Sequence, residues 1–164
     1  MTKRRNNLNP IVYFIVCLIA MILFDFMVTN HILHNIFLSE DFKFVDITYV
    51  RNTGAAFSSF AHATTLLIWI SVIAVLGILY ELFKDISKYT LPMYFLCAML
   101  TAGIFCNTYE RITLGYVRDF INLKFIDFPV FNISDILINL SVLAIIILII
   151  TKKYRRNAKT NIQN

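Results

Sequence analysis

Charged residues are scarce in this chain of 164 residues: they make up 15% of the sequence, against about 25% in an ordinary soluble domain. Apolar residues make up 59%, where about 45–50% is usual. Together the two values exclude a typical water-soluble core and favour a bilayer as the surroundings. The length allows one domain, and the sequence contains no internal repeat and no low-complexity segment.

Cysteine and clustered metal ligands are also scarce. The three cysteines, Cys17, Cys97 and Cys106, lie in or beside apolar runs, and their spacing matches no metal-binding pattern. We therefore expect no disulfide framework. His31 and His34 are three residues apart but bring no third ligand, so we expect solvated side chains rather than a metal site.

The net charge of +5 is concentrated at the two ends of the chain. Basic clusters beside apolar runs are typical of topology signals in membrane proteins, so they do not indicate binding of nucleic acid. The clusters comprise Lys3, Arg4 and Arg5 at the start, and Lys152, Lys153, Arg155, Arg156 and Lys159 at the end.

The predicted fold class is an all-α membrane protein: four transmembrane helices with a small periplasmic β-element. A bilayer core requires about 20 apolar residues per helix, and the last two runs need residues from their flanks to reach that length. The first run contains Asp25 and lacks a small-x-small cleavage site, so we expect a retained span rather than a cleaved signal peptide. We take residues 1–164 as a single domain, with spans at 11–33, 65–83, 91–107 and 136–151 and a disordered tail at 157–164.

The basic residues also predict the orientation. Most of them lie at the termini and in the short connection around Lys84 and Lys88, so the positive-inside rule predicts that both termini are cytoplasmic. The two long connections then lie outside. The first contains Phe42–Val50, where apolar and polar residues partly alternate before the turn signal Asn52-Thr53-Gly54, and we expect a short strand or hairpin at or above the membrane surface.

In this topology, acids and amides from distant parts of the chain converge at the outer face. A carboxylate near hydrocarbon is costly unless it is paired or hydrated, so these acids indicate either a structural pair, such as Asp25 with Arg111, or a functional site. Two carboxylates that share one proton can hydrolyse a peptide bond, because the ionised one accepts a proton from water and the protonated one donates to the carbonyl oxygen. The outer group comprises Asp25, Asn52, Asn107, Glu110, Arg111, Asp119, Asn132 and Asp135.

Three ordered blocks of sequence carry a family resemblance. Residues 52–57 read N-T-G-A-A-F, residues 107–121 contain N-T-Y-E-R and G-Y-V-R-D-F-I, and residues 128–135 read F-P-V-F-N-I-S-D. They resemble the N-x-G-A-A-F, N-x-x-D-R-x-x-x-G-x-V-x-D-F and F-P-x-F-N-x-A-D signatures of lipoprotein signal peptidase (signal peptidase II). The resemblance covers about residues 23–150.

The resemblance implies an aspartic endopeptidase that cleaves prolipoproteins on the N-terminal side of a diacylglyceryl-modified cysteine. Asp119 and Asp135 match the catalytic aspartates. The implied partners are diacylglyceryl-modified prolipoproteins and membrane lipids, and no metal or organic cofactor is implied. We expect a monomer in the bacterial inner membrane with its site at the periplasmic face. Positions that match supporting or substrate-binding residues are Asp25, Asn52, Gly54, Asn107, Glu110, Arg111 and Asn132.

The chain also departs from the family pattern. Glu110 is one methylene longer than aspartate and requires a new partner or a shifted backbone, Cys106 could crowd a close helix contact, and Arg118 could lower the pKa of the adjacent Asp119. A site loosened by about 1 Å can lose activity. A catalytically impaired paralogue that binds lipidated peptides, or a membrane scaffold sharing the fold, therefore stays open as an alternative. The departures are the missing lysine after Asp25, Cys106 for glycine, Glu110 for aspartate, Arg118 for an apolar residue and Ser134 for alanine.

Overall fold

The computed structural model describes residues 9–35, 43–54 and 64–163, with side chains described as far as residue 151. Ala55, Ala56 and Phe57 of the first motif lie outside the described residues, as does Phe42 of the expected strand. The elements, in chain order, are α1 (Pro10–His34), β1 (Val45–Asn52), α2 (Thr64–Phe83), α3 (Leu91–Leu114), β2 (Val117–Leu123) and α4 (Ile133–Gln163).

Four helices, α1, α2, α3 and the first part of α4 to Thr151, are long and apolar enough to cross a membrane, as predicted. Large apolar side chains on them are exposed, among them Met27 at 71% and Ile73 at 67%. Exposure of this kind is typical of helices that face lipid, because a bilayer gives no reason to bury them.

The helix ends differ from the predicted spans for local reasons. The Asn9 side chain accepts a hydrogen bond from the backbone N–H of Ile11, and Pro10 opens α1. Helix α3 continues to Leu114, seven residues beyond the prediction, and ends where Gly115 adopts φ +81°. Helix α4 continues to Gln163. This differs from the disordered tail predicted from residue 157, since no glycine or proline interrupts the helix that the span begins.

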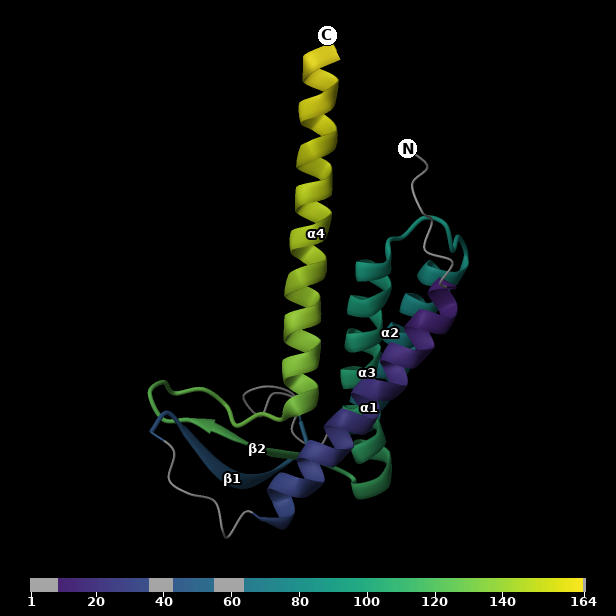
Figure 1. The fold of residues 1–164 in the computed structure, drawn as a ribbon. Helices are drawn as coiled ribbons and strands as arrows, with labels where there is room; N and C mark the ends of the chain where they lie inside the picture. Colours follow the sequence, from purple (N-terminus) through teal and green to yellow (C-terminus); the bar gives the residue numbers. More distant parts are fainter. Residues whose placement is uncertain (1–8, 36–42, 55–63, 164) are drawn as a thin grey trace.

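Helix α3 is the centre of the bundle. It packs against α1, α2 and α4, and half of its apolar window is buried. It lies close to α4 at Gly103, where an added Cβ would come within 2.6 Å of the Ser134 carbonyl oxygen. Small residues permit such close contact between membrane helices. In Figure 1, α4 stands beside the other three helices and extends beyond them.

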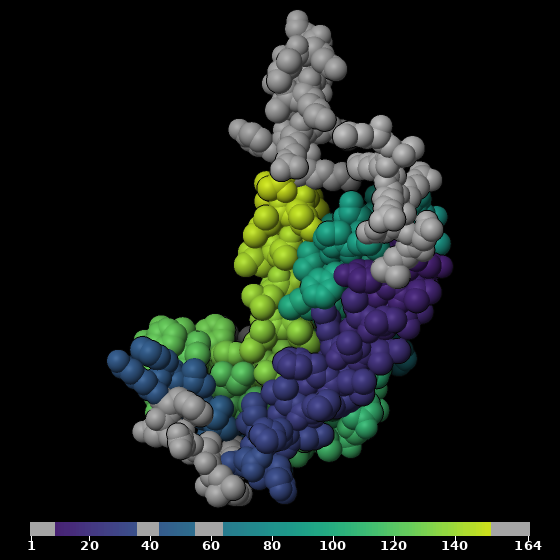
Figure 2. All heavy atoms as spheres, in the orientation of Figure 1, coloured from purple at the N-terminus to yellow at the C-terminus, as the bar shows by residue number. Residues whose placement is uncertain are grey.

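The small sheet lies at one end of the bundle, and the start of α1 and the end of α4 lie at the other (Figure 1). Strands β1 and β2 are antiparallel, with Val45 opposite Leu123 and Asn52 opposite Val117. The register shifts between Ile47 and Val50, beside the pair Val50–Asp119. The sequence predicted a short strand or hairpin within Phe42–Val50. The structure adds β2 as its partner, and Figure 2 shows the pair projecting sideways from the helices.

The sheet and α4 are connected through Phe131. Its carbonyl oxygen accepts from the backbone N–H groups of Phe120 and Ile121, and its own N–H donates to the Ile121 carbonyl. These bonds hold the residue that precedes Asn132 against the strand that carries Asp119. A loop and a strand that are distant from the helix core are thereby fixed at the start of α4.

Candidate functional site

Asp119 lies in β2 and is almost fully buried, with 1% of its surface exposed. The Asn52 side chain donates to its Oδ2 over 2.9 Å, and the Asn132 side chain donates to its Oδ1 over 2.8 Å. The first donor comes from the end of β1 and the second from the residue before α4. Each carboxylate oxygen is therefore held by an amide from a different segment of the chain.

Asp135 lies in the first turn of α4, where it forms a capping box with Asn132. The Asn132 Oδ1 accepts from the Asp135 backbone N–H over 2.9 Å, and the Asp135 Oδ2 accepts from the Asn132 backbone N–H over 3.2 Å. The other oxygen, Oδ1, accepts from the Asn107 side chain over 2.8 Å. A negative charge is favoured in this first turn by the helix dipole.

The two aspartates are joined by the Asn107–Asn132 pair. The Asn132 amide nitrogen donates to Asp119 and also to Oδ1 of Asn107 over 3.0 Å, while Asn107 donates to Asp135. The network runs from β2 through the α4 cap to α3. The sequence predicted these four residues as one site, and the structure brings them together.

Burial raises the pKa of Asp119 to about 7, and the negative charge of Asp135 contributes to the increase. The hydrogen bonds from Asn52 and Asn132 and the positive charge of Arg111 act in the opposite direction. Interacting carboxylates of this kind lose their protons as a pair. Near neutral pH the Asp119 carboxyl is thus in the range where it can hold or release a proton.

Arg111 supports the turn that carries Asn52. One guanidinium nitrogen donates to the Gly54 carbonyl over 3.0 Å, and another donates to the Asn107 carbonyl over 3.3 Å. The Asn52 Oδ1 accepts from the Gly54 N–H over 2.9 Å, which closes an Asx turn. Arg111 Nε is buried without a hydrogen-bond partner among the described residues. Since no described residue accepts from this donor, it can donate to a group that enters the site.

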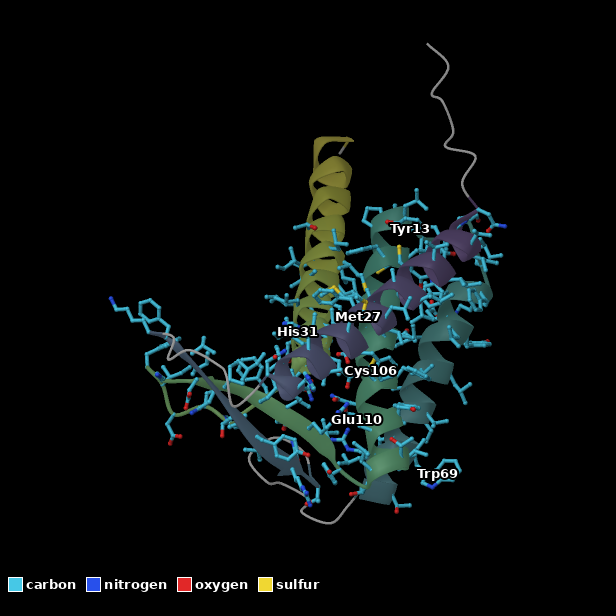
Figure 3. All side chains as sticks on the ribbon, turned by 60° about the horizontal axis from the view of Figure 1, so that its bottom comes forward. Tyr13, Met27, His31, Trp69, Cys106 and Glu110 are labelled. Carbon is cyan, nitrogen blue, oxygen red and sulfur yellow. The ribbon has the colours of Figure 1, made fainter. Side chains whose placement is uncertain are left out.

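Asp25 does not pair with Arg111, contrary to the structural pair considered from the sequence. Its buried carboxylate accepts a hydrogen bond of 2.6 Å from the Ser134 hydroxyl. The Cys106 thiol lies beside the same carboxylate, on the part of α3 that is labelled in Figure 3. Two departures from the family pattern, Cys106 and Ser134, therefore surround Asp25. The close helix contact that Cys106 was expected to crowd occurs one turn earlier, at Gly103.

Glu110 and Arg118 form an ion pair, with 2.6 Å between Glu110 Oε1 and Arg118 Nη2. Glu110 thus has the new partner that its extra length requires. The expectation that Arg118 lowers the pKa of Asp119 is wrong, because the guanidinium contacts Glu110 and the pKa of Asp119 is raised. Successive side chains of a strand point to opposite faces, so Arg118 and Asp119 point apart.

The roles of Ser134 and Arg118 were missed at the sequence level. Both stood out only as departures from a motif, and nothing in their spacing indicated Asp25 or Glu110 as partners. Among the described residues, no group of three His, Cys, Asp or Glu side chains could hold a metal ion. His31 and His34 are both exposed at the end of α1.

Comparison with known proteins gives consistent matches. The family model described as signal peptidase (SPase) II matches residues 17–151. A lipoprotein signal peptidase of Lactococcus lactis subsp. lactis is 32% identical over 85% of this chain and 94% of its own. Another, of Microcystis aeruginosa, is 36% identical over 61% of this chain and 64% of its own.

Solved structures match as well. A bacterial membrane enzyme determined in meso at 2.3 Å resolution has a TM-score of 0.75 and 30% identity, over 85% of this chain and 88% of that one. A second, at 1.9 Å, has a TM-score of 0.70 and 31% identity, over 83% and 91% of the two chains. Because the family model covers most of the chain and the Lactococcus lactis relative is 32% identical over 85% of it, the chain belongs to the signal peptidase II family.

Proposed function

We propose that this chain removes signal peptides from prolipoproteins, by cleavage on the N-terminal side of a diacylglyceryl-modified cysteine, with Asp119 and Asp135 as the catalytic pair. The observation that carries the proposal is the position of Asn132, which donates to both carboxylates where the sheet meets the start of α4. The family and its curated relatives support the reaction class.

The mechanism needs one proton shared by the two aspartates. The ionised carboxylate accepts a proton from water while the resulting hydroxide attacks the scissile carbonyl carbon, and the protonated carboxyl donates to the carbonyl oxygen. When the tetrahedral intermediate collapses, the C–N bond breaks and the nitrogen takes up a proton from the pair. The new carboxyl belongs to the signal peptide and the new amine to the lipid-modified cysteine.

The neighbouring amides keep the pair in position without neutralising it. Asn52 and Asn132 donate to Asp119, and Asn107 and the Asn132 backbone donate to Asp135. The Nε of Arg111, which has no partner among the residues that the structure describes, can donate to a substrate carbonyl beside the Asn52–Gly54 turn. Groups fixed in this way do not have to reorganise during the reaction, which is where preorganised sites gain most of their rate.

The surroundings proposed for this reaction follow from the distribution of charge. Lys84 and Lys88 lie at the end of the bundle opposite the aspartates. The start of α1 and the end of α4, which the basic segments of the sequence adjoin, belong to that same end. We therefore infer cytoplasmic termini, an inner-membrane location and a site at the periplasmic face. The exposed apolar faces of the helices contact membrane lipids. A monomer suffices, because one chain supplies both aspartates and all four amide donors.

Four of the five departures that left an impaired paralogue open have partners in the folded chain. Glu110 binds Arg118, and Ser134 and Cys106 lie against Asp25. These contacts support the active enzyme. The test is cleavage by the purified protein of a diacylglyceryl-modified prolipoprotein and of the same precursor without the lipid. Cleavage of the modified precursor alone is expected. Equal cleavage of both, or of neither, would overturn the proposed specificity or activity.

A further inference from the structure

Two of the departures from the family pattern, Glu110 in α3 and Arg118 in β2, bind each other. The Glu110 carboxylate accepts from the Arg118 Nη2 over 2.6 Å, from its Nε over 2.8 Å and from its backbone N–H over 2.7 Å. Glu110 is 6% exposed, so these bonds lie out of water. Figure 3 labels Glu110 on the part of α3 that lies next to the sheet.

The geometry couples this pair to Asp119. Arg118 directly precedes Asp119 in β2, and the two side chains point to opposite faces of the strand. The Glu110 carboxylate binds both the backbone N–H and the guanidinium of Arg118. It therefore fixes the position of β2 relative to α3 and the rotation of the strand about its own axis at that residue. The same constraint fixes the direction in which Asp119 leaves the other face of the strand.

A third element joins the pair. The Arg118 Nη1 is 3.5 Å from the Asn30 Oδ1 in α1, the longest of its contacts. Asn30 lies a little more than one helical turn after Asp25, in the segment where the family pattern has a lysine and this chain has none. A positive charge is therefore brought to this part of α1 from β2, by Arg118.

We infer that Glu110 and Arg118 are a positioning pair for Asp119, which holds the start of β2 against α3 and α1. The inference rests on the proposed catalytic role of Asp119. Charge-assisted bonds that are largely removed from water are costly to break singly, because the remaining partner stays buried without its counter-charge. Loss of either partner lets β2 shift, and a shift of about 1 Å at a catalytic group can reduce the rate about 100-fold.

The test compares Arg118→Gln, Glu110→Gln and the double variant with wild type, using the lipid-modified prolipoprotein as substrate. Each single variant is expected to lower kcat about 10- to 100-fold with KM within about twofold. The double variant is expected to be no slower than the slower single variant, because both remove one shared interaction. Arg118→Lys, which keeps the charge but not the planar fork, is expected to recover part of kcat.

The pH profile separates positioning from a general loss of structure. Burial is the main cause of the raised pKa of Asp119, with Asp135 and Arg111 as the charged groups facing it. A displaced strand admits water to Asp119, so the alkaline limb of the profile is expected to move to lower pH in Arg118→Gln. Glu81→Gln, which removes the exposed ion pairs with Lys84 and Lys88 at the opposite end of the bundle, is the control and is expected to leave kcat and the profile unchanged.

A wild-type kcat and pH profile in folded Arg118→Gln would overturn the inference, and so would additive effects in the double variant. If Arg118→Gln does not yield folded protein, Arg118→Lys carries the same test, and its wild-type profile together with a wild-type kcat would again overturn it. Asp119→Asn is measured beside these variants. Cleavage that survives in Asp119→Asn refutes the proposed function itself, whereas an inactive Asp119→Asn with an unaffected Arg118→Gln refutes only the positioning pair.

Discussion

The side-chain nitrogen of Asn132 lies 2.8 Å from Oδ1 of Asp119, although one residue caps a membrane helix and the other belongs to a strand. The same Asn132 side chain accepts from the backbone N–H of Asp135. A single amide thus sets the relative position of two carboxylates that come from different elements.

Asn132→Ala is expected to lower both stability and activity. The loss of the cap is expected to cost about 0.5–2 kcal/mol in unfolding free energy, and the freed carboxylates are expected to reduce kcat by about 10- to 100-fold. The matched control is Asn9→Ala, which removes the side-chain cap of α1 far from the aspartates. Thermal unfolding in detergent and cleavage assays would measure both. Equal activity of the two variants would refute the bridging role of Asn132.

Cleavage is expected to decline as the pH rises through about 7, where Asp119 loses its proton. An ordinary aspartate ionises near 3.8, so its proton would already be gone in this range. Because the raised pKa lets the pair keep one proton up to neutral pH, kcat/KM is expected to be high below about 7 and to fall above it. A profile measured with folded enzyme that stays flat from neutral to alkaline pH would contradict the shared proton.

Gly103→Ala is expected to separate α3 from α4. An added Cβ would come within 2.6 Å of the Ser134 carbonyl oxygen and 2.8 Å of the Ile138 side chain. The expected cost is about 1–3 kcal/mol of stability, with a loss of activity because Asp135 starts on the displaced helix. At Gly77 in α2 no atom of the described residues lies within 4 Å of an added Cβ, so Gly77→Ala is expected to be neutral or slightly stabilising. Thermal unfolding of the two variants in detergent decides the comparison.

Ser134→Ala is expected to destabilise the protein by about 1–3 kcal/mol, because the buried Asp25 loses its hydroxyl donor. Ser141→Ala is the control. Ser141 is also fully buried, but its hydroxyl donates to the Ile138 carbonyl of its own helix. Its removal is expected to cost less than about 1 kcal/mol. Equal melting temperatures for the two variants would show that Asp25 does not depend on Ser134.

Much of the fold could be predicted from the sequence because long, uninterrupted apolar runs identify membrane helices. The ends of the helices could not be predicted, because they depend on single residues. Helix α3 continues to Leu114, where the left-handed Gly115 ends it, and the Asn132 cap starts α4 before the apolar run. Strand β2 was missed because its buried positions, with Val117 and Phe120 at 1% and 0% exposure, are set by tertiary contacts rather than marked by alternation.

The site was predictable where the motifs fix residue types, as for the amides around Asp119 and Asp135. It was not predictable where the chain departs from the motifs. The longer side chain of Glu110 indicated a changed partner. Arg118 is identified as that partner only by the register of β2, in which the Arg118 and Asp119 side chains point to opposite faces. In the same way, Ser134 looked like a mild change until α1 brought Asp25 against it.

The most direct measurement is cleavage of a diacylglyceryl-modified prolipoprotein by wild type, Asp119→Asn and Asp135→Asn, with binding of the lipopeptide measured on the same preparations. Wild type is expected to cleave. Both variants are expected to bind the lipopeptide while their cleavage rates fall at least about 1000-fold, because each variant lacks one of the two carboxyl groups that transfer protons. A variant that binds and still cleaves at a rate near that of wild type would contradict the catalytic pair.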